Sequence, residues 1–317
     1  MAITISGGVQ LSGPVVLTQS SGGGGGSYSF QGSNYGYTSG GQSPAPTNTI
    51  DKFSFTSDGN ASDVGDLSEN KQGVIGQSSS TSGYASGGYD ATYIITIDKF
   101  PFASDGNASD VGDLTDARWY GCGQSSSTSG YTSGGAFAHK DIIDKFPFAS
   151  DGNATDVGDL TVARYGAGGQ SSDASGYTSG GNADGSPGDV NTIDKFPFAS
   201  DGNATDVGDL AAAIKLTAGQ SSTTSGYTSG GVTSGAYINS INKFSFSSDG
   251  NATDVGDLTL ARQNSAGQSS TASGYTSGGN EGSKLNTIDK FPFASDGNAT
   301  DVGDLSLTRD TIAGQQY

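Results

Sequence analysis

The 317-residue sequence is poor in the residues from which most catalytic and metal centres are built, with one cysteine, one methionine, one tryptophan and one histidine. The lone Cys122 excludes an internal disulfide framework and is compatible with synthesis in a reducing cytoplasm. The lone His139 excludes a multi-histidine metal site and leaves a Ser-His-Asp relay remote. We therefore expect a non-enzymatic protein with no cofactor and no metal.

Positive charge and long apolar runs are also scarce. Lys and Arg number 14 against 32 Asp and Glu, which gives a net charge of −18. This balance disfavours binding to nucleic acid or to an anionic membrane, because both recruit basic side chains. Residues 1–19 have neither a basic n-region nor an apolar run long enough for a signal peptide or a membrane span. We expect no nucleic-acid partner, no membrane partner and no Sec-dependent export.

What the sequence has in abundance is repetition. The tetrapeptide Ser-Asp-Gly-Asn occurs six times at intervals of 46 to 50 residues, beginning at Ser57, Ser104, Ser150, Ser200, Ser248 and Ser295. An Ile-x-Lys-Phe-x-Phe element precedes each copy and gives every unit an apolar strand to bury, although only 32% of the residues are hydrophobic. A period of about 50 residues suits a four-stranded propeller blade and is too long for one rung of a β-helix. The repeat predicts an all-β fold, a six-bladed β-propeller of four-stranded antiparallel blades over residues 28–317.

Each unit contains four predicted strands and no helix signal. In the fourth unit these strands are Ala167–Ser171, Gly176–Gly181, Ile193–Ala199 and Thr205–Leu210. The third strand alternates two sets of side chains and so separates two faces. Gly and Asn tolerate positive φ, so the Ser-Asp-Gly-Asn connection to the fourth strand is predicted to be a hairpin turn.

The ends of the sequence predict how the ring closes. Only five complete first strands lie between complete units, and the C-terminal Ile312–Tyr317 matches the missing copy. We expect this segment to pair with Gly36–Gly41 as the innermost strand of the first blade, which removes an open sheet edge. The alternative source of that strand is Tyr28–Gln31.

The units resemble kelch repeats over residues 31–317. A Gly-Gly pair ends the second strand, and a Leu in the fourth strand precedes a basic residue by four positions, as in Leu114 with Arg118, Leu160 with Arg164, Leu258 with Arg262 and Leu305 with Arg309. This resemblance implies a propeller. The sequence departs from the kelch pattern where Ile214 replaces the basic residue and where a valine stands in place of a fourth-strand Trp, at Val64, Val111, Val157, Val207, Val255 and Val302.

The amino-acid sequence of the repeat, IDKFPFASDGNATDVGDLT with GYTSGG, resembles that of repeat-bearing virion structural proteins of tailed phages, especially phages of marine bacteria. That resemblance implies a tail-fibre, appendage or decoration protein, assembled in the host cytoplasm and located on the virion surface. Its partners would be other virion proteins, a host surface glycan or protein, and further copies of the chain. The alternative is a carbohydrate- or protein-binding propeller of a bacterial cell surface, and an enzyme is the weakest hypothesis.

A short β-rich extension, residues 1–27, precedes the propeller. It alternates turns with short apolar stretches that contain Ile3, Ile5, Val9, Leu11, Val15 and Val16, and it ends in five consecutive glycines at 22–26. Such a glycine run makes a flexible joint, so we expect an attachment segment that joins the disc to other virion proteins. A disordered tail is the alternative.

The connections between strands predict two unlike faces. Turns from the first to the second strand and from the third to the fourth are nearly identical in all units and acidic, whereas the connections on the opposite face differ in length and composition. Variable loops on a rigid scaffold usually carry binding. The candidate binding residues are therefore Tyr89, Tyr93, Trp119, Tyr120, Phe137, His139 and Tyr237.

Two acidic motifs recur in the units. The loop with Asp58, Asp63 and Asp66 offers oxygen ligands of the kind that calcium takes, but it lacks EF-hand spacing, and we interpret it as a structural turn. The Asp-Lys pair of the third strand, replaced once by Asn242-Lys243, is predicted to form ion pairs or hydrogen bonds between blades.

Overall fold

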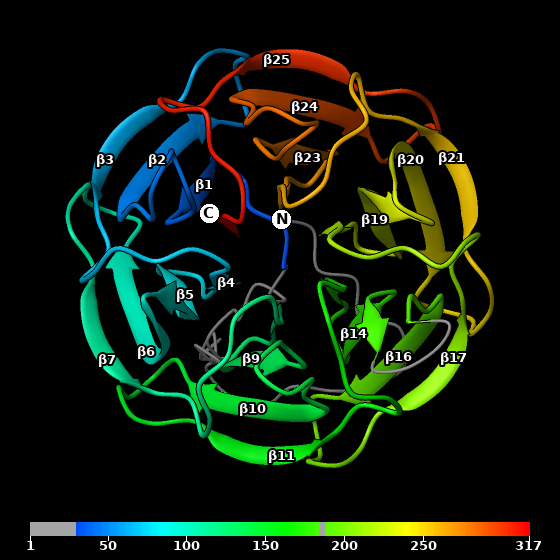
Figure 1. The fold of residues 1–317 in the computed structure, drawn as a ribbon, viewed down its shortest axis with the longest axis horizontal. Helices are drawn as coiled ribbons and strands as arrows, with labels where there is room; N and C mark the ends of the chain where they lie inside the picture. Colours follow the sequence, from blue (N-terminus) through cyan, green and yellow to red (C-terminus); the bar gives the residue numbers. More distant parts are fainter. Residues whose placement is uncertain (1–29, 184–187) are drawn as a thin grey trace, which may run out of the picture.

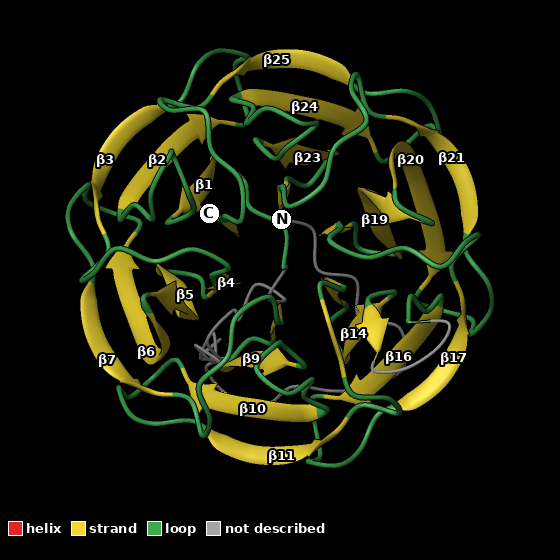
Figure 2. Cartoon of the chain, in the orientation of Figure 1, coloured by secondary structure: helices red, strands yellow, loops and turns green. Residues whose placement is uncertain are grey.

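Residues 30–183 and 188–317 are described by the computed structural model, and they form six blades around a central axis (Figure 1). Each blade is a sheet of four antiparallel strands, and these residues contain no helix (Figure 2). It follows that the described part of the chain has no helix long and apolar enough to span a membrane. The predicted all-β, six-bladed propeller is confirmed. The predicted attachment residues, from Ile3 to Val16, lie outside the described residues.

All blades have the same strand order from the axis to the rim. The innermost strands are β26 (Ala313–Gln316), β4 (Ile75–Ser78), β8 (Cys122–Ser125), β13 (Gly168–Ser171), β18 (Ala218–Ser221) and β22 (Ala266–Ser269). The second strands are β1 (Tyr35–Ser39), β5 (Ser82–Asp90), β9 (Ser129–Ser133), β14 (Ser175–Ser179), β19 (Ser225–Thr233) and β23 (Ser273–Ser277). The third strands are β2 (Thr49–Ser54), β6 (Thr92–Pro101), β10 (Ile142–Pro147), β16 (Thr192–Pro197), β20 (Ala236–Ser245) and β24 (Thr287–Pro292). The outermost strands are β3 (Ser62–Asp66), β7 (Ser109–Asp113), β11 (Thr155–Asp159), β17 (Thr205–Asp209), β21 (Thr253–Asp257) and β25 (Thr300–Asp304), and a separate ribbon pairs β12 (Arg164–Tyr165) with β15 (Asn182–Ala183).

The C-terminal strand closes the ring. β26 pairs with β1 in antiparallel register, with Ala313 opposite Ser39 and Gln316 opposite Gly36. Closure by the C-terminal segment is therefore confirmed. Gln31, from the alternative segment, instead donates its side-chain amide to the carbonyl of Ser221, 2.9 Å away on the inner strand of the fifth blade.

Glycine brings the innermost strands into backbone contact at the axis. A Cβ atom added to Gly123 would lie 1.9 Å from the carbonyl oxygen of Gly76, and one on Gly219 would lie 2.2 Å from that of Gly169. No residue with a side chain fits at such distances. The same close approach occurs at each equivalent position, which are Gly76, Gly123, Gly169, Gly219, Gly267 and Gly314.

The glutamine that follows each of these glycines links two blades. Gln124 Nε2 donates to Ser133 Oγ in its own blade and to the carbonyl of Tyr177 in the next blade, each at 2.9 Å. All of these amides are buried, so their hydrogen bonds satisfy groups that would otherwise be costly to bury. The equivalent bonds to the next blade join Gln77 to Tyr131, Gln170 to Tyr227, Gln220 to Tyr275, Gln268 to Tyr37 and Gln315 to Tyr84.

The apolar core lies between blades rather than within them. The third strand alternates its side chains, so Phe146 of β10 packs on Tyr84 of the preceding blade, while Ile143 packs beside Tyr131 and against Phe196 of the following blade. The ring centroids of Tyr84 and Phe146 are 5.4 Å apart. Every junction contains an equivalent cluster, and each blade is therefore stabilised by both neighbours.

The Ser-Asp-Gly-Asn connection clasps the preceding blade at the outer rim. Asp151 accepts a hydrogen bond from Lys99 Nζ at 2.8 Å, and Asn153 Oδ1 accepts one from the backbone N–H of Asp113 at 3.1 Å. Ala154 N–H donates to the carbonyl of Asp113 at 2.7 Å. The predicted ion pairs between blades are confirmed at every junction, and they join Lys52 to Asp105, Lys99 to Asp151, Lys145 to Asp201, Lys195 to Asp249, Lys243 to Asp296 and Lys290 to Asp58.

A second ion pair is fully buried at five of the junctions. Arg118 Nη2 lies 2.8 Å from Asp144 Oδ2, and the other oxygen of this carboxylate accepts from Thr115 Oγ1 at 2.6 Å. Burial lowers the pKa of Arg118, and the charge of Asp144 opposes that effect. The equivalent pairs are Lys71 with Asp98, Arg164 with Asp194, Arg262 with Asp289 and Arg309 with Asp51.

The junction between the fourth and fifth blades lacks this ion pair, and all three residues of the network are replaced there. Ile214 occupies the place of the basic residue, Asn242 that of the carboxylate and Ala211 that of the hydroxyl donor. Ile214 and Asn242 are both 1% exposed. Removing one charge alone would leave the other buried and unpaired, which is far more costly than removing both. The two departures that the sequence displays at 214 and 242 are therefore one coupled change.

The coupled junction leads to a stability prediction. The single change Asp144→Asn is expected to lower the free energy of unfolding by about 3–5 kcal/mol, because it leaves the guanidinium of Arg118 buried without a charge partner. The triple variant Thr115→Ala, Arg118→Ile, Asp144→Asn reproduces the neutral junction and should recover most of that loss. Urea unfolding of both variants measures the difference.

A matched control comes from the neutral junction itself. Asn242→Asp alone buries a carboxylate against Ile214 and should destabilise the protein strongly. A triple variant no more stable than Asp144→Asn alone would show that the two junctions are not equivalent.

Ring closure leads to a second prediction. Deleting residues 311–317 removes β26 and exposes the edge of β1, so the melting temperature should fall by about 5 °C or more and aggregation should increase. Deleting residues 1–26 is the control and should leave the melting temperature unchanged. An unchanged melting curve after the C-terminal deletion would count against closure by this strand.

Candidate binding site on the individualised face

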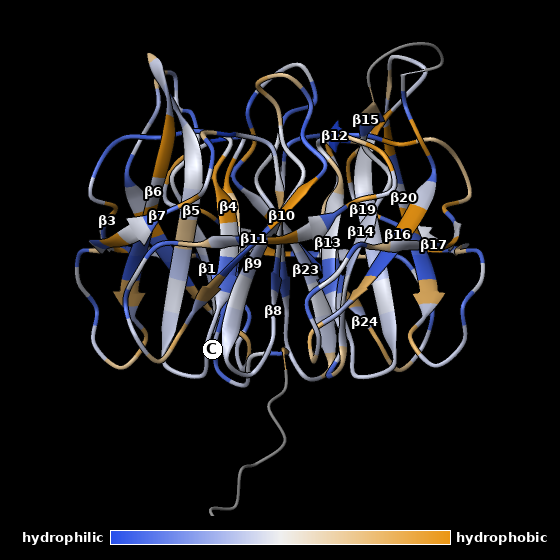
Figure 3. Ribbon diagram, turned by 90° about the horizontal axis from the view of Figure 1, so that it is seen from below, coloured by the Kyte–Doolittle hydropathy of each residue, from blue (hydrophilic) through white to orange (hydrophobic). Residues whose placement is uncertain are grey.

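The two faces of the disc differ in their loops. The connections from second to third strands and from fourth to first strands form one face, here called the individualised face, and the remaining turns form the uniform face. Figure 3 shows the loops that include β12 and β15 rising from one face, opposite the face on which the C-terminus lies. The longest hairpins on the individualised face are β5–β6 and β19–β20, which belong to blades on opposite sides of the ring (Figure 1).

Most of the predicted binding residues form one aromatic cluster on the individualised face. Tyr89 lies 5.2 Å from Tyr93 and 5.3 Å from Trp119 between ring centroids. Tyr93 also contacts Phe137 at 4.3 Å, and Trp119 contacts Tyr120 at 4.4 Å. These rings come from the second and third blades, so the cluster extends across their junction.

Sequence reasoning missed one member of this cluster. Tyr165 lies 6.2 Å from Tyr120 and 5.0 Å from His139 between ring centroids. Its signal was available, because Tyr165 follows Arg164 just as Trp119 follows Arg118. The remaining predicted residue, Tyr237, is 40% exposed on β20 of the fifth blade and takes no part in the cluster.

The backbone of the connections between blades positions Trp119 and Tyr120. The carbonyl of Trp119 accepts from Ala136 N–H at 2.8 Å, which fixes it against the loop of the third blade. Tyr120 has φ 55° and belongs to a closed ring in which each N–H donates to the carbonyl of the preceding member at 2.5 to 3.0 Å. The ring members, with φ between 55° and 65°, are Gly73, Tyr120, Gly166, Leu216, Asn264 and Thr311.

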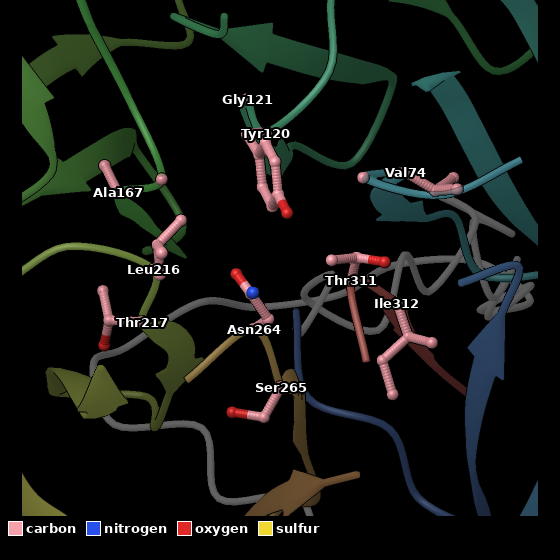
Figure 4. A pocket seen from close by; sticks show the side chains of 12 residues that line it. Val74, Tyr120, Gly121, Ala167, Leu216, Thr217, Asn264, Ser265, Thr311 and Ile312 are labelled. Atoms are coloured by element: carbon pink, nitrogen blue, oxygen red, sulfur yellow. The ribbon is translucent and has the colours of Figure 1, made fainter. Parts of the chain in front are cut away.

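Four side chains of this ring line a cavity of about 70 Å³ (Figure 4). They are those of Tyr120, Leu216, Asn264 and Thr311. Burial raises the pKa of Tyr120 well above its usual range, which favours the neutral phenol. Burial also raises the pKa of Cys122 to about 11, which keeps this thiol from acting as a nucleophile.

A cleft of about 520 Å³ lies beside this cavity on the individualised face, and the two share Tyr120 and Leu216 as lining residues. Its lining consists of Tyr93, Trp119, Tyr120, Ala136, Phe137, Ala138, Tyr165 and Leu216. This volume is typical of small-molecule sites, and the lining contains no charged side chain. Phe137 is 51% exposed at its rim, and the backbone there is strained, with φ 81° at Phe137 and 56° at Ala138.

The acidic groups of the uniform face are engaged within the protein. Asp58 pairs with Lys290 at 2.9 Å, and Asp63 accepts from the backbone N–H of Gly65 at 3.2 Å. Among residues 30–183 and 188–317, no group of three or more His, Cys, Asp or Glu side chains is arranged to hold a metal ion. The side chains of Asp58 and Asp63 thus have a structural use.

This arrangement predicts the effect of neutralising one loop. In the double variant Asp151→Asn, Asp156→Asn, the amides retain the turn, and only the exposed ion pair to Lys99 is lost. The free energy of unfolding should fall by about 1 kcal/mol or less, with no change in any ion requirement. If titration calorimetry found stoichiometric calcium binding that this variant abolishes, the loops would be calcium sites.

Comparison of the chain with protein-family models finds no match, and comparison with curated proteins finds none.

Proposed function

We propose that this chain is a non-enzymatic structural and adhesive component of a tailed-phage particle, which displays a kelch-like propeller on the virion surface. The phage assignment is supported by the resemblance of the repeat sequence to virion structural proteins of tailed phages. The kelch assignment is supported by the buried basic residue after the fourth strand, as at Arg118 and Arg262. Residues 1–27 would attach the disc to other virion proteins, and the individualised face would meet the host surface.

The observation that carries this proposal is the polarity of the disc. Gly32 N–H donates to the carbonyl of Ser269 at 2.8 Å, beside the turn between β22 and β23 on the uniform face. Phe30 lies near the axis, where it lines a cavity with the glycines of the innermost strands. Residues 30–32, the first that the structure describes, therefore lie at the uniform face, opposite the aromatic cluster. A disc held through its N-terminal segment would leave the individualised face pointing outward.

A cell-surface propeller that binds carbohydrate or protein is the second candidate, because the aromatic cleft would serve it equally well. The two differ in their genomic neighbours. Adjacent virion genes would favour the phage particle, and adjacent surface-export genes would favour the cell surface.

Attachment through residues 1–27 can be tested by truncation. A chain that starts at Ser27 should fold into an intact propeller, because the six blades and their closure lie within residues 30–317. It should nevertheless be absent from assembled particles, because it lacks the segment that we propose binds the disc to other virion proteins. Quantitative mass spectrometry of purified particles measures its occupancy relative to the full chain.

The control for this truncation is its melting curve, which should match that of the full chain. Recovery of the truncated disc on particles at normal occupancy would show that the blades make the anchoring contacts instead.

A further inference from the structure

The aromatic cluster is not required by the propeller scaffold. The position of Trp119 is equivalent in every blade, since each copy pairs with the residue that follows the Gly-Gly pair of the next unit. Other blades fold with polar residues at this position, namely Gln72, Lys215, Gln263 and Asp310. Aromatic residues occur there only in two adjacent units, at Trp119 and Tyr165. Their presence reflects something other than blade architecture.

The loop at the rim of the cleft is costly for folding. Phe137 and Ala138 are consecutive L-residues with positive φ, and such conformations persist only where the surroundings enforce them. Ala136 N–H bonded to Trp119 and Lys140 N–H bonded to Gly135 hold this loop at 2.8 and 2.9 Å. The strained loop then presents the ring of Phe137 to solvent, where it returns little stability. Strain that holds an exposed aromatic side chain points to binding.

We infer that the cleft binds a neutral glycan, with sugar rings stacked on Tyr93, Trp119 and Phe137; the inference deepens the proposed recognition role and depends on it. Tyr93 and Phe137 lie 4.3 Å apart between ring centroids with their planes at 36°, and Tyr93 meets Trp119 edge-on at 6.3 Å. Phe137 and Tyr93 are still 51% and 37% exposed, so part of their ring surface is open to a ligand. The C–H face of a pyranose is apolar and matches such an exposed aromatic surface. The phenol and indole groups at the ring edges can bond to sugar hydroxyls.

Charge narrows the class of glycan. The cleft has no charged lining residue, and the protein as a whole carries −18. Uronic-acid, sulfated and phosphorylated glycans would be repelled and would find no basic partner in the cleft. A quaternary ammonium group is the competing ligand, because aromatic rings and negative charge both attract it. A cage for such a cation needs rings held apart around it, whereas Tyr93 and Phe137 pack directly on each other at 4.3 Å between centroids.

The chain contains its own reporter for this site, because Trp119 is the sole tryptophan. The full chain would be titrated with neutral hexasaccharides of glucose, mannose and N-acetylglucosamine while the emission of Trp119 is recorded. Alginate hexasaccharide and choline chloride serve as the anionic and cationic probes. We expect a saturable change with at least one neutral hexasaccharide and none with alginate or choline.

Three variants distinguish the cleft from nonspecific stacking. Tyr93→Ala and Phe137→Ala should each weaken binding by about tenfold or more, as expected for a hot-spot side chain. Tyr237→Ala is the matched control, because Tyr237 is 40% exposed and Tyr93 37% exposed, but Tyr237 lies on the fifth blade. It should leave binding unchanged. Melting curves of all three variants should match that of the parent chain, since the altered side chains are exposed.

Two kinds of result would overturn the inference. One is a saturable response to choline or alginate alone, or no response to any neutral hexasaccharide. The other is a neutral-sugar response that survives both cleft variants. Occupancy on phage particles is scored separately: sugar binding by a chain that joins no particle would refute the phage assignment alone, and normal occupancy without sugar binding would refute the glycan alone.

Discussion

The contact between neighbouring blades is the interaction on which the rest of this structure depends. A third strand such as β10 gives Phe146 to the preceding blade and Ile143 to the following one, so no blade has a core of its own. An open row of such blades would leave one apolar face unburied at each of its ends. Closing the row into a ring removes both, and β26 makes the closure covalently continuous with the last blade.

The same constraint accounts for a composition that would otherwise suggest disorder. The chain contains 53 glycines and few hydrophobic residues, yet many of these glycines lie where two backbones meet. At the axis, Gly123 allows two innermost strands to approach through their main chains. At the rim, Gly112 approaches the backbone of Gly152 in the next blade, where an added Cβ would lie 2.3 Å from its carbonyl oxygen. Backbone packing and buried hydrogen bonds such as those of Gln124 therefore supply stability that other domains obtain from a core of large apolar side chains.

Periodicity made the fold predictable from the sequence, and the partners across each junction were much less so. Strand order, blade number and C-terminal closure all follow from counting repeated segments. The sequence also displays Ile214 and Asn242 as exceptions, but their coupling is invisible there, because the basic residue of one unit pairs with the carboxylate of the next. The ring of positive φ was equally hidden, since Leu216 and Thr311 are residue types that rarely adopt this conformation. Tyr165 is absent from the predicted binding residues because, in the sequence, the connection Tyr165-Gly166-Ala167 resembles an ordinary link between two units.

Symmetry also limits where function can reside. On the uniform face, several side chains that every unit shares are used in contacts with a neighbouring blade, as Asp58 is by Lys290 and Asn60 by the backbone of Asp304. A change there would weaken a junction, so this face has little freedom to acquire a new property. The loops of the individualised face carry few such obligations, and the blades tolerate Gln72 or Lys215 where the second blade has Trp119. An asymmetric binding site has the most freedom to arise in those loops, and at the junction of the second and third blades the departure from symmetry brings together aromatic rings, a strained backbone and an exposed side chain, as at Trp119 and Phe137.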